Sequence, residues 1–167
     1  MTRKVQIAVI GDGQPPAEVA GWAEEVGRLL AQRGAVVICG GLGGVMAAAA
    51  RGAAAAGGLT VGIVPTYDAR TANPAIAVTI PSGMGEARNV LVVASGQAVI
   101  ALPGAYGTQS EVALALKLGK PVIGVRAWGE VRGVRVAQTP AEAVELALSA
   151  AHKAKESVKR NKVKRET

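Results

Sequence analysis

One stretch of the chain combines a glycine-bearing turn with a carboxylate. Residues 103–107 are Pro-Gly-Ala-Tyr-Gly, and Glu111 follows four residues later. An apolar run at 98–102 predicts a buried strand before the turn, and 112–118 predicts a helix after it. Such a turn presents free backbone N–H groups at the positive end of a helix dipole, where phosphate binds. The sequence therefore predicts an anion site beside an acid, and chemistry on a phosphorylated ligand such as a nucleotide.

Arg88 is a candidate to meet that anion. It follows Gly83-Met84-Gly85-Glu86-Ala87, at the predicted start of a helix over 86–94. A cation in a first helical turn opposes the helix dipole, at a cost of about 0.3 kcal/mol or more unless an anion compensates it. Two interpretations stay open: a surface or ion-paired arginine, partly compensated by Glu86, or an arginine that binds an anion or polarises a substrate.

Other residues that could take part in chemistry also have a purely structural interpretation. Thr108-Gln109-Ser110-Glu111 matches a capping box, with Thr108 as the N-cap and Glu111 three residues into the helix, and this role can coexist with catalysis. Asp12 repels phosphate but suits a cap at a helix start, which we favour. Cys39 ends an apolar run and is predicted to be a core residue.

The elements that position these residues alternate between strand and helix. Strands are predicted over 5–10, 35–39, 59–64, 75–80, 98–102 and 121–125, with a short edge strand over 134–136. Several are unbroken Val/Ile/Ala runs, which is typical of a parallel sheet covered on both faces. We therefore predict a single doubly wound, Rossmann-like α/β domain with a mostly parallel sheet of six to seven strands. Ligands bind at the carboxyl ends of such strands, where the glycine turns 11–13, 40–44 and 103–107 fall.

Length and charge suggest one domain and an appendage. The 167 residues fit a phosphate- or nucleotide-binding domain over 1–150 and a basic tail over 151–167. The formal net charge is +7, and the tail holds seven Lys or Arg against two Glu. We interpret the tail as a solvated end, with a weak nucleic-acid tether as the alternative. It contains no aromatic residue for base stacking, so nucleic acid is not an expected partner.

Several function classes are excluded or disfavoured by composition. The chain has one histidine and one cysteine, so a histidine triad, a multi-histidine metal site and an internal disulfide are not possible within it. No P-loop lysine follows a glycine turn, which argues against an ATPase. The apolar runs are too short for a membrane span and no signal peptide is recognised. We expect a cytoplasmic protein without metal or cofactor.

Three ordered motifs resemble the Lonely Guy (LOG) family, formerly mislabelled lysine decarboxylases. They are residues 40–46, 85–89 and 103–111, and the resemblance covers about residues 5–150. The chain is most similar to short bacterial members that also resemble molybdenum cofactor carrier proteins and, more distantly, DNA-processing protein A. LOG enzymes hydrolyse nucleoside 5′-monophosphates to a free base and ribose 5-phosphate. The resemblance implies Arg88 and Glu111 as catalytic residues. It implies a phosphate or nucleotide site at Gly11, Gly41, Gly43, Gly44, Met84, Asn89, Pro103, Gly104, Ala105, Gly107 and Thr108.

Two departures from the LOG pattern favour the carrier-like branch. Ala105 replaces a glycine of the motif, and Asn89 stands where LOG enzymes typically have lysine. The resemblance therefore implies either a phosphoribohydrolase or a non-catalytic carrier or sensor of a phosphorylated ligand such as molybdenum cofactor. It also implies a homodimer or a higher homo-oligomer.

Overall fold

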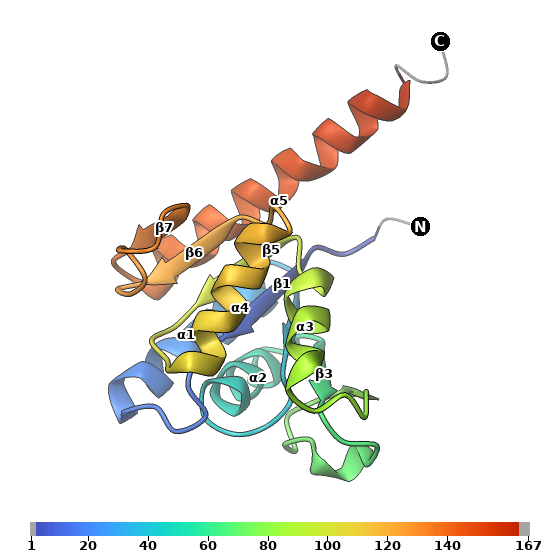
Figure 1. The fold of residues 1–167 in the computed structure, drawn as a ribbon, viewed down its shortest axis with the longest axis vertical. Coiled ribbons are helices and arrows are strands. Elements are labelled where there is room, and N and C mark those ends of the chain that lie inside the picture. The colour runs from blue at the N-terminus through green and yellow to red at the C-terminus, as the bar shows by residue number, and fades with distance from the viewer. Residues whose placement is uncertain (1–2, 164–167) are drawn as a thin grey trace.

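A single parallel sheet organises the computed structural model, which describes residues 3–163 and their side chains as far as Lys153 (Figure 1). The strand order is β4-β3-β2-β1-β5-β6-β7, and neighbouring strands pair in parallel. The predicted doubly wound, Rossmann-like fold is confirmed, with seven strands. Their bounds are β1 Gln6–Ile10, β2 Val36–Cys39, β3 Thr60–Val64, β4 Val78–Pro81, β5 Ala98–Ala101, β6 Val122–Val125 and β7 Val134–Ala137.

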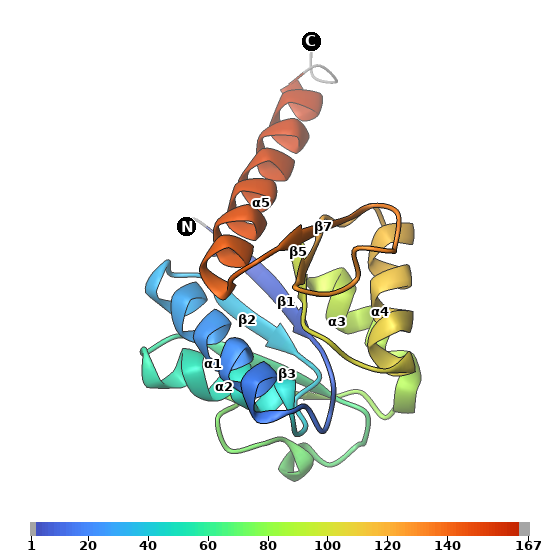
Figure 2. The same ribbon diagram turned by 90° about the vertical axis from the view of Figure 1, so that its left-hand side faces the viewer.

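Helices cover both faces of the sheet, as Figure 2 shows. α1 and α2 pack together on one face, with α5 against α1, whereas α3 and α4 pack together on the other. Two short 3₁₀ turns, η1 (Ala69–Thr71) and η2 (Gly85–Arg88), lie in the connections. The helices are α1 Ala17–Gln32, α2 Val45–Ala55, α3 Asn89–Ser95, α4 Tyr106–Lys117 and α5 Pro140–Val163.

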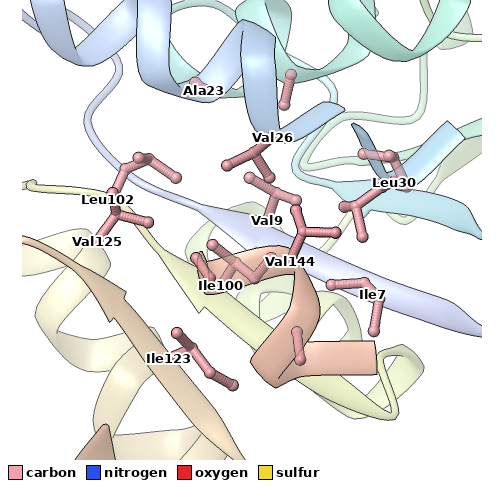
Figure 3. Packing of buried hydrophobic residues seen from close by; sticks show 14 of the residues in the cluster. Ile7, Val9, Ala23, Val26, Leu30, Ile100, Leu102, Ile123, Val125 and Val144 are labelled. Atoms are coloured by element: carbon pink, nitrogen blue, oxygen red, sulfur yellow. The ribbon is translucent and has the colours of Figure 1, made fainter. Parts of the chain in front are cut away.

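Alternation along the strands divides the core into two clusters. On β1, Ile7 and Val9 face α1, α2 and α5, while Ala8 and Ile10 face α3 and α4. Figure 3 shows Val9 among side chains from the helices and neighbouring strands of the first cluster. Burying each Val, Leu or Ile side chain contributes about 1.5–3 kcal/mol, so this sheet is a rigid support for the turns at its ends.

The fourth strand begins at Val78, three residues later than predicted. The backbone of the preceding residues bonds to a side chain of β3 instead of joining the sheet. Thr60 Oγ1 donates to the Ala75 carbonyl at 2.7 Å and accepts the N–H of Ala77 at 2.8 Å. The helix predicted over 86–94 is also split, because η2 precedes α3.

Two capping predictions are wrong. α4 begins at Tyr106 with Ala105 as its N-cap and no side-chain cap, so Thr108 lies inside the first turn, where it is buried. Gly104 permits this, because a Cβ there would overlap the Thr108 side chain. Asp12 does not cap α1, whose N-cap is Pro16. It caps its own turn instead, where Asp12 Oδ1 accepts the N–H of Gln14 at 2.9 Å.

The predicted basic tail begins within α5, which continues to Val163 and projects beyond the body of the protein (Figure 1). Residues 164–167 of that tail lie outside the described residues. The division of the chain at residue 150 therefore stays a prediction. Over residues 3–163, no helix has the length and apolar character needed to cross a bilayer.

Candidate functional site

A pocket of about 270 Å³ lies at the carboxyl ends of the central strands. Its walls come from four segments that are distant in sequence: 9–13 at the end of β1, 40–46 after β2, 86–89 around η2, and 105–111 at the start of α4. β1 and β5 are neighbours where the strand order reverses, which is the position where doubly wound folds bind ligands. The predicted site residues that line the pocket are Gly11, Arg88, Asn89, Ala105, Gly107, Thr108 and Glu111.

Arg88 is a buried wall residue of this pocket. Its side chain is 6 % exposed, so its interpretation as a surface arginine is wrong. Nη1 donates a hydrogen bond to Asn89 Oδ1, whereas Nε is buried and has no partner within the described residues. A buried cation with an unused donor is costly without an anion to complete it. Gly40 makes room for this guanidinium, because a Cβ at that position would lie 2.7 Å from Arg88 Nη2.

Glu111 places a carboxyl group in the same pocket and is 7 % exposed. Burial raises its pKa to about 7; Arg88 opposes that rise in pKa, and the negative charge of Glu86 adds to it. Both protonation states of Glu111 are therefore populated near neutral pH. A perturbed carboxyl beside a cation in a cleft is a typical arrangement for acid–base chemistry.

The start of α4 supplies hydrogen-bond donors to the pocket. Because the helix begins at Tyr106, the N–H groups of Tyr106, Gly107 and Thr108 have no carbonyl partner within the helix. They lie at the positive end of the helix dipole, which favours an anion. Ala105 has φ of −95° and an exposed side chain, so its methyl group needs no unusual backbone conformation.

Several predicted phosphate-binding residues lie outside the pocket lining and pack the turns together. Gly44 has φ of +61°, and a Cβ there would overlap the backbone of Asp12 and Gly13. The contact joins the turns after β1 and β2, where Val45 N–H donates to the Asp12 carbonyl at 2.9 Å. Ligand contacts stay a prediction for Gly41, Gly43, Gly44, Met84, Pro103 and Gly104.

Other lining residues were not among the predicted site residues. Glu86 lies two residues before Arg88, and Asp12 is the polar residue of the first glycine turn. Both were noticed in the sequence, but Glu86 was interpreted as a partner of Arg88 and Asp12 as a helix cap. Leu42 and Met46 lie in the motif 40–46 but were left out of the predicted site, since an apolar residue after a strand usually belongs to the core. The lining residues missed are Val9, Ile10, Asp12, Gly13, Gly40, Leu42, Met46 and Glu86.

Cys39 is a core residue, as predicted. It is fully buried, and burial raises its pKa to about 11, which keeps it a thiol. In the described part of the chain, no three His, Cys, Asp or Glu side chains gather in a way that could hold a metal ion.

A second cavity, of about 670 Å³, lies at the other end of the sheet. It is bordered by Val5 before β1, by the end of α1 and by α5. Arg33 and Glu145 form an ion pair across it, with side chains 53 % and 54 % exposed. His152 and Lys153 complete its rim and are exposed. This second cavity therefore has charged groups that are hydrated or paired.

Known proteins share this architecture over most of its length. A cytokinin riboside 5′-monophosphate phosphoribohydrolase from Mycobacterium tuberculosis is 35% identical over 130 residues, which are 71% of this chain and 68% of that protein. A molybdenum cofactor binding protein from Rippkaea orientalis is 37% identical, with a TM-score of 0.82 over 89% of this chain and 98% of its own. The molybdenum cofactor carrier protein of Chlamydomonas reinhardtii is 33% identical, with a TM-score of 0.83 over 90% and 99%.

These likenesses confirm the resemblance to LOG proteins and to the molybdenum cofactor carrier branch. A family model matches residues 4–161, which is nearly the whole chain. The chain belongs to the SLOG cluster4 family.

Proposed function

We propose that the pocket binds a phosphorylated small molecule and that the protein is a nucleoside 5′-monophosphate phosphoribohydrolase. One observation carries this proposal: Glu111, with its raised pKa, lies in the same pocket as Arg88, whose buried Nε has no partner within the described residues. The similarity to the mycobacterial phosphoribohydrolase agrees with it. The label of lysine decarboxylase does not suit the pocket, since none of the described lysines lines it.

The proposed reaction breaks the bond between C1′ of the ribose and the nitrogen of the base. Positive charge develops on the ribose ring as the base leaves with the bonding electrons. Ionised Glu111 would stabilise that charge or accept a proton from the water that attacks C1′. The water oxygen ends on C1′ and its proton balances the charge of the departing base. The products are the base and ribose 5-phosphate.

Arg88 and the start of α4 would hold the ligand for this reaction. The free N–H groups of Tyr106, Gly107 and Thr108 suit the 5′-phosphate. The free Nε of Arg88 suits a ribose or phosphate oxygen, or the leaving base. The pocket also contains the carboxylates of Asp12 and Glu86, so among the described lining residues its positive field comes from Arg88 and the backbone donors.

A carrier of a phosphorylated ligand such as molybdenum cofactor is the second candidate. The likeness to the two molybdenum cofactor proteins extends over nearly the full length of each, which favours it. Asn89 also favours it, because its side chain takes one donor of Arg88 where LOG enzymes typically have a lysine. The carrier would use the same pocket and the same backbone donors without hydrolysis.

Release of ribose 5-phosphate from a panel of nucleoside 5′-monophosphates tests the first candidate. We expect release by the native protein and its loss in Glu111→Ala. Turnover that survives both Glu111→Ala and Arg88→Ala would refute the assignment. If a folded protein releases no product, mass spectrometry of the ligand that co-purifies with it tests the carrier, which requires a phosphorylated pterin or nucleotide.

The remaining expectations about partners and location are also proposals. We propose a homodimer or higher homo-oligomer, as in the LOG family, and light scattering with size-exclusion chromatography measures it. We propose a cytoplasmic location without a nucleic-acid partner. DNA affinity that disappears on deletion of residues 153–167 would revive the interpretation of the tail as a tether.

A further inference from the structure

Asn73 lies in the connection between β3 and β4 and binds the turn that follows β2. Its backbone N–H donates to the Gly41 carbonyl at 2.8 Å, and its Nδ2 donates to the carbonyls of Gly41 and Leu42 at 3.1 and 2.9 Å. Its Oδ1 accepts the N–H of Ala75 at 3.1 Å, which fixes the amide orientation. One side chain therefore holds two successive carbonyls of this turn.

This arrangement sets the direction of two backbone donors. In a trans peptide the carbonyl and the N–H of the same plane point in opposite directions. The carbonyls of Gly41 and Leu42 point to Asn73, so the N–H groups of Leu42 and Gly43 point away from it. Within residues 3–163, neither N–H has a hydrogen-bond partner. Successive free N–H groups of this kind form an anion-binding concavity.

The turn borders the buried cation of the pocket. Leu42 and Gly40 both line the pocket, whereas Asn73 does not. Arg88 contacts this turn at Gly40, and its Nε is buried without a partner in the described chain. The unsatisfied guanidinium points independently to an anion in this pocket, whose wall the turn helps to form.

We propose that Asn73 is a positioning residue of the site: by binding the carbonyls of Gly41 and Leu42, it orients the N–H groups of Leu42 and Gly43 as the anion subsite of the glycine turn that is expected to bind phosphate. This inference rests on the proposed phosphorylated ligand but not on hydrolysis. Through Asn73, the connection between β3 and β4 orients backbone donors of the site, although Asn73 itself lies outside the pocket lining.

The rest of that connection has its own internal bonds. Thr71 Oγ1 donates to the Asp68 carbonyl at 2.8 Å, and the hydroxyls of Thr66 and Thr71 lie 2.9 Å apart. These contacts order the loop without touching the turn after β2. Thr71→Val is therefore a matched control for Asn73→Ala, since each variant removes side-chain hydrogen bonds from the same loop.

Amide NMR during a titration with ribose 5-phosphate tests the subsite. We expect the Leu42 and Gly43 resonances of the native protein to shift together with those at the start of α4. Asn73→Ala should weaken binding about tenfold and reduce the shifts at Leu42 and Gly43, while Thr71→Val binds as the native protein does.

Each alternative outcome is decisive. Shifts confined to residues 106–108 would overturn the subsite and leave the proposed function intact. Native affinity in Asn73→Ala would overturn the positioning role of Asn73 and also leave the proposed function intact. A native protein that does not bind ribose 5-phosphate would contradict both proposals. If Asn73→Ala does not fold, the native titration alone decides whether the two N–H groups contact the anion.

Discussion

The two cavities at opposite ends of the sheet differ in how their charges are satisfied. The second cavity is more than twice as large, but Arg33 and Glu145 are half exposed and neutralise each other. The smaller pocket buries Arg88 and Glu111 and leaves the Nε of Arg88 without a partner in the described chain. Because its buried charge is not completed by the described residues, we propose the smaller pocket, and not the larger cavity, as the ligand site.

The largest expected difference between the cavities is in turnover. Glu111→Gln removes the ionisable group from the pocket and should lower kcat/KM for the best nucleoside 5′-monophosphate by about 10²–10⁴-fold. Glu145→Gln makes the same chemical change in the second cavity and should leave kcat/KM unchanged. Equal effects of the two substitutions in a ribose 5-phosphate assay would remove the distinction between the cavities.

Stability should respond to pH at Glu111 in the opposite sense to an ordinary salt bridge. The pKa of Glu111 is about 7 in the folded protein against 4.5 for an unperturbed glutamate. The folded protein therefore loses stability as pH rises from 4.5 to about 7, because the unfolded chain releases this proton first. Glu111→Gln removes that penalty, which reaches about 3 kcal/mol above neutral pH and vanishes below the unfolded pKa.

Urea unfolding of Glu111→Gln at about pH 5.5 and about pH 8.5 measures this effect. The gain over the native protein should be about 2 kcal/mol larger at the higher pH. Glu145→Gln is the matched control and should show no such trend. A gain that does not depend on pH would mean that the native Glu111 is not titrating in this range.

A smaller difference is expected between the effects of Arg88 and Arg33 on ligand affinity. Arg88→Met removes a charged donor from the pocket and should weaken ribose 5-phosphate binding about 10- to 100-fold, the equivalent of one charge-assisted hydrogen bond. Arg33→Met should change the affinity by less than about twofold, which is about the error of the calorimetric titration that measures it. Affinity that survives Arg88→Met would assign the anion to the backbone donors alone.

The smallest effect is expected from the ion pair of the second cavity. Arg33 and Glu145 are more than half exposed, and such pairs contribute about 0.2–1 kcal/mol to the free energy of unfolding. Arg33→Ala and Glu145→Ala should each lie within that range, and the double variant should differ little from either one. A loss of several kcal/mol would show that this cavity is more than a hydrated surface cleft.

Much of the fold could be predicted because its signals are local. Unbroken apolar runs predicted parallel strands, and glycine turns at their ends predicted the edge of the sheet where the pocket lies. The capping box failed for a reason that is not local: Thr108 packs against Gly104, and α4 starts before it. The same Thr-x-x-Glu pattern fits a helix start or a helix interior, and only the neighbouring turn decides between them.

The candidate site was only partly predictable, because distant segments form it together. Arg88 and Glu111 were identified from their positions beside helix starts. Gly40 was missed, since its function is to leave space for a guanidinium that lies 48 residues later in the sequence. Glycines at 41 and 44 suggested a phosphate loop, although at Gly44 the lack of a Cβ is needed for contact between two turns.

The reversal of strand order has a consequence for how the protein folds. β1 pairs with β5, with Ile7 opposite Ala98, although three strands and three α-helices lie between them in the sequence. Bringing such distant segments together is a slow step of folding. Glu111, on the helix after β5, and Gly11, in the turn after β1, come together only when this pairing forms. A ligand therefore has no complete site until β1 and β5 have paired and would shift the equilibrium only toward the paired sheet, so its binding would report this pairing.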